Sequence, residues 1–179
     1  MPTETKTKTG TASPSIYVAC LASYNSGHLH GRWIDLTGGE DATETDIREM
    51  LATSPAPDAE EYAVHDFEGF GAYRVSEWSN VSTLVEIAEA VEEYGPFILA
   101  YLAEVHDDLG DAVASAEEMT EADNFAAYVS DYVDDCILAE VDPSSTLARY
   151  FDYDKFERDM AYEHTILANP AGGVFILHA

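Results

Sequence analysis

The segment from Val75 to Ala148 holds eighteen Asp and Glu residues and no Lys or Arg. Apolar residues recur through it at helical spacing, so we expect folded helices with carboxylates on their exposed faces rather than a disordered acidic tail. Solvated helix faces ordinarily mix both signs of charge, because Glu–Lys pairs stabilise a helix. A pattern of one sign over so long a stretch predicts that the charge itself serves a function.

The whole chain is strongly acidic, with 35 Asp and Glu against 8 Lys and Arg in 179 residues and a formal net charge of −27. Its hydrophobic content of 46% is ample for packed cores. So large a charge destabilises a compact state, and it is kept for solubility, for adaptation to high salt, or as a functional surface. At one charge per roughly 1.7 Å of duplex axis, the net charge corresponds to about 46 Å of DNA. Because the few basic residues are scattered, binding to nucleic acid or to an anionic membrane is disfavoured.

The two cysteines, Cys20 and Cys136, each fall within an apolar pattern. Buried free thiols in a reducing cytoplasm are the expected state, and a disulfide between them is the alternative. Residues 1–14 are rich in Thr, Ser, Lys and Pro, so we expect a disordered tail without a secretory signal. No run reaches the length of a membrane-spanning helix. The sequence therefore predicts a cytoplasmic protein.

An N-terminal α+β domain is predicted over residues 15–75. Two β-rich runs joined by turn residues at 24–27 predict antiparallel strands at 16–21 and 31–36, and the alternating run 61–66 predicts a third strand. A short helix between the second and third strands is expected to begin at a cap formed by Thr43 and to end near Ala52, with three apolar side chains inward: Ile47, Met50 and Leu51.

A central domain of acidic helices is predicted over residues 76–115. Its first helix has an apolar face, made of Leu84, Ile87, Ala88 and Val91, and an acidic face, made of Glu86, Glu89 and Glu93. Gly95-Pro96 interrupts the chain, and Gly110 marks a further candidate break. Between them a second apolar stripe (Ile98, Leu102, Val105 and Leu109) stands opposite Glu104, Asp107, Asp108 and Asp111.

A C-terminal α+β domain is predicted over residues 116–179. An acidic helix is expected to begin at a cap formed by Thr120, with an inward stripe of Phe125, Val129, Tyr132 and Cys136 and outward carboxylates at Asp131, Asp134 and Asp135. Residues 145–162 are predicted to be helical in one or two pieces. The apolar runs 165–168 and 174–177 flank Asn169-Pro170-Ala171-Gly172-Gly173, which predicts a terminal β-hairpin.

No constellation of residues indicates catalysis or a cofactor. His28 and His30 flank a turn without an evident third metal ligand, and His65-Asp66 stands without a nucleophile motif. The carboxylates at 107–111 and 152–154 do not fit the spacing of a calcium-binding loop. We therefore predict a protein that is not an enzyme and that holds no metal or cofactor. An enzyme with a carboxylate metal site is the least favoured alternative.

Several separated motifs resemble those of one protein family. The run IYVACLASYNSG at 16–27, leading to GRWIDL at 31–36, is similar to the N-terminal signature of the ArdA-type antirestriction proteins, which reads as an IYV strand, a YN-x-G turn and a G-x-W-x-DL strand. The similarity continues at 61–70 (EYAVHDFEGF), returns at 150–159 (YFDYDKFERD), and spans about residues 15 to 178. The chain departs from the pattern at Cys20, where many relatives have a polar residue. It matches the family's acidic antirestriction motif only loosely, around residues 121–137.

The resemblance implies an elongated chain of three small domains that dimerises and mimics bent B-form DNA. Such proteins occupy the DNA-binding groove of type I restriction–modification enzymes without catalysis. They travel on plasmids, transposons or phages and protect incoming DNA. Acidic helices fit this role, because carboxylates at helical spacing recur every roughly 5 to 10 Å, of the order of the spacing between phosphates. The rival interpretations are an acidic adaptor for another basic DNA-binding protein and a salt-adapted protein of other function.

The carboxylates expected to replace phosphates lie on the acidic helix faces. The first set is Glu86, Glu89, Glu93, Glu104, Asp107, Asp108 and Asp111, and the second is Glu117, Glu118, Asp131, Asp134 and Asp135. Exposed charges each contribute little, so we expect the binding energy to be spread over many of them. Single alanine substitutions should then change inhibition slightly, and multiple charge removals should change it strongly.

Overall fold

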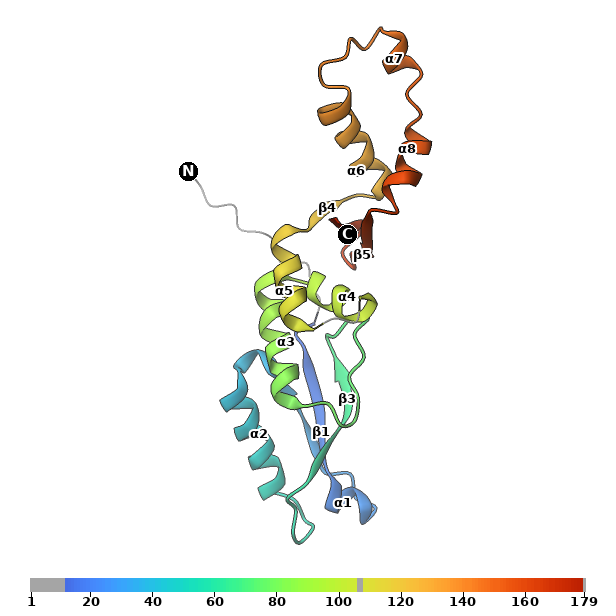
Figure 1. Ribbon diagram of the computed structural model, residues 1–179. Coiled ribbons are helices and arrows are strands. Elements are labelled where there is room, and N and C mark those ends of the chain that lie inside the picture. The colour runs from blue at the N-terminus through green and yellow to red at the C-terminus, as the bar shows by residue number, and fades with distance from the viewer. Residues whose placement is uncertain (1–11, 106–107, 179) are drawn as a thin grey trace. The chain divides into compact units, whose positions relative to one another are not determined.

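The computed structural model describes residues 12–105 and 108–178 and shows helices with two small antiparallel sheets (Figure 1). The α+β class expected from the sequence is confirmed. The chain divides into two compact units, residues 1–103 and 104–179. The expected three domains stay a prediction, although helix α5 (Leu109–Glu118) continues past residue 115, the expected end of the central domain. Within these described ranges, every helix is too short or too polar to cross a bilayer.

The first unit is built on a sheet of three β-rich segments in the order β2-β1-β3. The central strand β1 (Ser15–Cys20) pairs antiparallel with β2 (Gly31–Asp35) and with β3 (Tyr62–Glu68), which confirms the three expected strands. The turn after β1 differs from the expectation, because a short helix, α1 (Leu21–Asn25), precedes it. The turn itself falls at Gly27, whose φ of 82° lies in the left-handed region that glycine tolerates.

The N-terminal segment is ordered before β1 begins. Residues 1–11, most of the expected tail, lie outside the described residues. Pro14 is buried, and its carbonyl oxygen accepts a hydrogen bond of 3.1 Å from the backbone amide of Leu36. The end of the expected tail therefore packs on the sheet of the first unit.

Four helical segments complete the first unit: the 3₁₀ turn η1 (Leu36–Gly38), α2 (Glu40–Ala52), α3 (Val81–Tyr94) and α4 (Phe97–Glu104). Helices α2 and α3 lie along the same side of the sheet (Figure 1). The core combines strand residues such as Ile16, Val18 and Ile34 with the apolar faces of the helices. The salt bridge from Arg32 to Asp46, at 2.9 Å, joins β2 to α2.

Two helix predictions in this unit were wrong. Helix α2 begins at Glu40 rather than at Thr43, because Glu40 and Asp41 suit the positive end of the helix dipole. Thr43 is instead buried, and its hydroxyl donates to the carbonyl oxygen of Gly39 at 2.9 Å. The second apolar stripe does not form one helix to Leu109, since α4 ends at Glu104 and α5 begins at Leu109. The expected break at Gly95 is confirmed, with φ of 78° at the end of α3.

The second unit contains a sheet in the order β4-β6-β5. Strands β5 (His164–Ala168) and β6 (Val174–His178) form the expected terminal hairpin, and β4 (Thr120–Ala122) adds an unexpected third strand. Helix α6 (Phe125–Tyr132) continues into a π-helix, η2 (Val133–Ile137), and two short helices follow, α7 (Thr146–Arg149) and α8 (Tyr153–Met160). Val129 and Val133 pack with Met160 in the buried cluster of this unit.

The start and the inward face of the acidic helix in this unit were predicted wrongly. Thr120 lies in β4, and Asn124 caps α6 by accepting a hydrogen bond from the amide of Ala127 at 2.9 Å. Tyr132 and Cys136 are exposed: Val133, four residues after the buried Val129, takes the inward position instead of Tyr132, and the wider turn of the π-helix moves Cys136 off that face. Both cysteines are free thiols, Cys20 buried as expected and Cys136 exposed.

Candidate target-binding surface

The acidic segment is displayed on the outside of both units. Of the eighteen Asp and Glu residues between Val75 and Ala148, Asp107 lies outside the described residues, and the other seventeen are all exposed. The segment itself supplies no Lys or Arg to neutralise them. Each unit therefore displays exposed carboxylates from this segment on helices and turns that the structure describes.

Helix α3 separates its apolar and acidic faces as the sequence predicts. Asn80 caps it by accepting a hydrogen bond from the amide of Ser82 at 2.9 Å. Leu84, Ile87 and Ala88 are buried, and Glu86, Glu89 and Glu93 are exposed. Glu92, which the prediction left out, is exposed on the same helix, and its position three residues after Glu89 would have indicated this.

The described carboxylates that were predicted to replace phosphates around α5 are exposed at both ends of this helix. Glu104 is the last residue of α4, and Asp108 is the N-cap of α5, where its carboxylate accepts a hydrogen bond of 2.9 Å from the amide of Asp111. Glu117 and Glu118 are the last two residues of α5. Carboxylates at the first turn stabilise a helix, and those at the last turn destabilise it.

Two of the acidic helices have paired glutamates in their last turn. Glu92 and Glu93 lie in the last turn of α3, Glu117 and Glu118 lie in the last turn of α5, and neither turn contains a basic residue. A charge at a helix terminus changes stability by about 0.3–1 kcal/mol, and here its sign is unfavourable. Glu117 and Glu118 therefore lie at the unfavourable end of the dipole of α5, which argues that they are kept for a purpose other than folding.

The carboxylates of α6 and η2 are exposed, and one of them is held by another element. Asp131 lies in α6, and Asp134 and Asp135 lie in η2. Asp134 accepts a hydrogen bond of 2.7 Å from the hydroxyl of Tyr153, which begins α8. This hydrogen bond raises the pKa of the Tyr153 phenol. The contact fixes a carboxylate in position at the surface, and nothing in the local spacing predicts it.

The acidic residues of α2 have a different environment. Arg32 pairs with Asp46 at 2.9 Å and with Glu49 at 3.4 Å, and Arg48 pairs with Glu44 at 3.7 Å. Cationic side chains therefore offset part of the charge on α2. The segment from Val75 to Ala148 lacks such residues in its own sequence.

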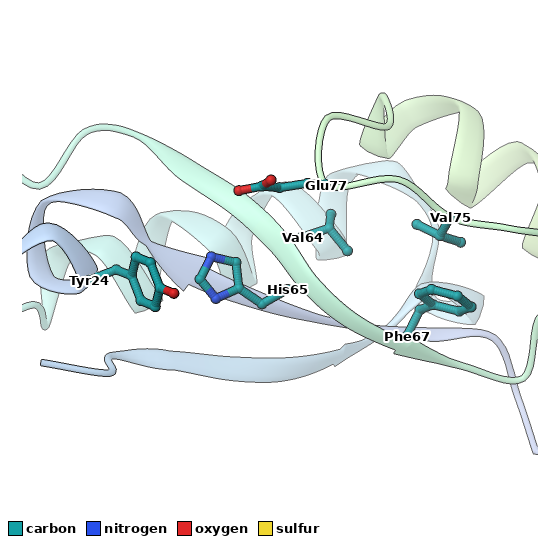
Figure 2. Close-up of a pocket in the computed structure, with 6 residues that line it drawn as sticks. All are labelled: Tyr24, Val64, His65, Phe67, Val75 and Glu77. Atoms are coloured by element: carbon teal, nitrogen blue, oxygen red, sulfur yellow. The ribbon is translucent and has the colours of Figure 1, made fainter. Parts of the chain in front are cut away.

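The histidines discussed as candidate sites serve structural contacts. A hollow of about 350 Å³ along β3 is lined by residues that include Tyr24, His65 and Glu77. Figure 2 shows Tyr24 and His65 facing each other at one end of it, with ring centroids 4.7 Å apart. The rings of His28 and His30 lie within hydrogen-bond distance of two different backbone carbonyls. Among the described residues, no three His, Cys, Asp or Glu side chains are gathered as ligands for a metal ion.

Comparison with known proteins agrees with the sequence motifs. A search of curated proteins finds no match. The family described as antirestriction protein (ArdA) matches residues 16–174, which is most of the chain and most of each unit. The chain therefore belongs to the ArdA family of antirestriction proteins.

Proposed function

We propose that this antirestriction protein is a mimic of B-form DNA that fills the DNA-binding groove of type I restriction–modification enzymes and blocks them without chemistry. The observation that carries the proposal is the exposure of all seventeen described carboxylates in a segment that has no Lys or Arg. A groove lined with Lys and Arg attracts such a surface as it attracts phosphates. The proposal places the protein in the cytoplasm with its target.

The charge density of one helix shows how much surface the mimic needs. Helix α3 has 14 residues, and at 1.5 Å per residue it is about 21 Å long. Its four glutamates give one charge per roughly 5 Å, against one per about 1.7 Å in duplex DNA. A single helix therefore reaches about a third of the density of DNA, so several acidic elements must act together. This supports the expectation that all twelve predicted carboxylates contribute and that none dominates.

The scaffold supports the proposal because it fixes carboxylates before binding. Leu84 and Ile87 anchor α3 in the core, and Asn80 and Asp108 cap α3 and α5. A surface that is ordered in advance loses less conformational entropy when it binds. Fast association and a strong dependence on salt should follow from the charge.

The proposal includes a homodimer, which would double the acidic surface. The second unit exposes large apolar side chains on its described residues, with Leu147 at 62% and Tyr150 at 77% exposed. Exposed apolar side chains of this size favour contact with another protein. Light scattering on the eluted protein should give twice the mass of one chain.

The decisive experiment is a titration of the protein against a purified type I enzyme, with duplex DNA as the competitor, at two salt concentrations. The proposal predicts that DNA raises the protein concentration needed for inhibition and that the higher salt weakens binding. An acidic adaptor would bind another basic protein, and it would not compete with DNA for the type I enzyme. An enzyme that continues to cut DNA in the presence of the folded protein would contradict the proposal.

A further inference from the structure

A second hollow in the first unit combines aromatic rings with carboxylates. It has a volume of about 490 Å³ and is lined by Leu21, Glu60, Glu61, Tyr62 and Trp78. We propose that this hollow receives an arginine side chain of the protein that the chain inhibits. The identity of that protein rests on the proposed function, whereas the preference for a guanidinium group rests on the hollow itself.

Trp78 is the most distinctive side chain of this hollow, because it is 72% exposed on an ordered turn. The turn is closed by a hydrogen bond of 2.9 Å from the amide of Ser76 to the hydroxyl of Ser79 and one of 3.1 Å from the amide of Ser79 to the carbonyl of Ser76. The amide of Val64 in β3 also donates to the carbonyl of Glu77 at 3.2 Å. The backbone therefore holds a large aromatic side chain mostly in water, where it gains little from burial. Such residues are typical anchors of protein interfaces.

The backbone that carries the two glutamates of the hollow is also attached to its surroundings. The amide of Leu21 donates to the carbonyl of Glu61 at 3.0 Å, which fixes the start of β3 beside α1. Glu60 and Glu61 are both exposed, so their charges are available at the rim. Tyr62, the first residue of β3, follows them and is 36% exposed. The hollow thus has a preformed backbone frame with negative charge at its edge.

This combination selects a cation. Two carboxylates repel an anionic ligand, and they leave an apolar ligand next to charges that it cannot satisfy. A cation is attracted both by carboxylates and by the faces of aromatic rings, with tryptophan the strongest of these. Arginine fits better than lysine, because its planar guanidinium stacks on a ring while it donates several hydrogen bonds to carboxylates.

The hollow should act differently from the acidic helices. Exposed charges on the helices attract a basic groove over a long range and are screened by salt. A stacked guanidinium is a short-range contact that excludes water, so salt should weaken it less. The two kinds of contact can therefore be separated by mutation at two salt concentrations.

The first test measures inhibition of a type I enzyme by Trp78→Ala and Tyr62→Ala. Trp78→Ala should weaken inhibition roughly twofold to thirtyfold, by a similar factor at low and high salt. The matched control is Leu29→Ala, because Leu29 is 69% exposed in the same unit and lies outside the hollow. Trp78→Phe should restore part of the loss. Wild-type inhibition by Trp78→Ala, or a loss equal to that of Leu29→Ala, would overturn the proposal. Thermal melting followed by circular dichroism checks that each variant is folded.

The second test does not require the restriction enzyme. In a Trp33→Phe background Trp78 is the only tryptophan, and phenylalanine keeps the ring contact that Trp33 makes with Tyr17 at 5.7 Å. Titration with the peptide acetyl-Gly-Arg-Gly-amide should change the Trp78 fluorescence saturably, and the citrulline analogue should not. The change should be smaller in the double variant Glu60→Gln, Glu61→Gln. Equal responses to the two peptides, or no response, would overturn the arginine site.

The two tests distinguish failure of this site from failure of the proposed function. Arginine-specific fluorescence together with uninhibited type I enzyme would keep the site and refute the proposed target. Full inhibition with no effect of Trp78→Ala would keep the proposed function and refute the site. A dimer that becomes a monomer on Trp78→Ala would show that a second copy covers the hollow, which would also refute the site.

Discussion

Removing three carboxylates from α3 together, by Glu86→Gln, Glu89→Gln and Glu93→Gln, should weaken inhibition of a type I enzyme. All three side chains are exposed on the face opposite the core. An exposed ion pair contributes about 0.2–1 kcal/mol, so three lost pairs amount to about 0.6–3 kcal/mol. Since 1.4 kcal/mol is a factor of ten, the triple variant should bind roughly 3-fold to 150-fold more weakly, and each single variant about 1.4-fold to 5-fold more weakly.

The same triple variant should be more stable than the natural protein. Glu86 and Glu89 are three residues apart, and Glu89 and Glu93 are four apart, so each pair repels across one helical turn. Removing a like-charge pair recovers about 0.2–0.5 kcal/mol, and neutralising Glu93 in the last turn recovers about 0.3–1 kcal/mol more. The midpoint of thermal unfolding should rise by about 2–4 °C for each kcal/mol gained in the free energy of unfolding. Weaker inhibition by a more stable protein cannot be attributed to unfolding.

The assay is DNA competition for the type I enzyme at two salt concentrations, together with thermal melting followed by circular dichroism. A control with the same change in charge is Asp41→Asn, Glu44→Gln and Glu49→Gln on α2. Glu44 and Glu49 pair with Arg48 and Arg32, so this variant should lose stability and retain most of its inhibition. Equal weakening by the two sets would refute the reasoning, because only net charge would then matter. Undiminished inhibition by the α3 variant would refute it as well.

Three further predictions concern the scaffold. Ellman's reagent should label Cys136 rapidly in the native protein and Cys20 only after unfolding, since Cys20 is 0% exposed; rapid labelling of both would contradict the packing of β1. Asn124→Ala removes the cap of α6 and should cost about 0.5–2 kcal/mol in denaturant unfolding, and no measurable loss would exclude the capping role. The pKa of Tyr153 is raised by its hydrogen bond to Asp134. The stability that this contact contributes is therefore fully present below the pKa of an unfolded tyrosine and is lost as pH rises through the folded pKa. Ultraviolet difference titration against Tyr153→Phe should show the raised pKa, and Asp134→Asn should return it toward the ordinary range.

The local sequence predicts those elements in which pattern and packing agree. The apolar face of α3 follows from spacing, because Leu84 and Ile87 recur at the helical period, and the strands β1, β2, β5 and β6 follow from β-rich or apolar runs separated by turn residues. The predictions fail where tertiary pairing overrides local preference. Thr120 has the chemistry of a cap, yet it pairs with Ile176 in a strand that only β6 makes favourable. Cys136 has helical spacing from Val129, yet the π-helix displaces it to the surface.

The candidate site also has features that the sequence predicts and features that it does not. Exposure of the acidic faces was predictable, because charged side chains opposite an apolar stripe must face water. The contact of Asp134 with Tyr153 and the hollow around Trp78 were not, because each joins residues that are far apart in the chain. Only the folded backbone brings them together.

The acidic residues beside β3 have a second effect, which follows from the position of this strand in its sheet. β3 is an outer strand of its sheet, covered at the amide of Val64 by its hydrogen bond to Glu77, and the rest of an outer strand can pair with the same strand of another molecule and so begin aggregation. Exposed acids border it at Glu61, Asp66 and Glu68, where two copies that approach edge to edge would bring like charges together. Repulsion at that edge should keep concentrated protein dispersed even when no restriction enzyme is present to bind it.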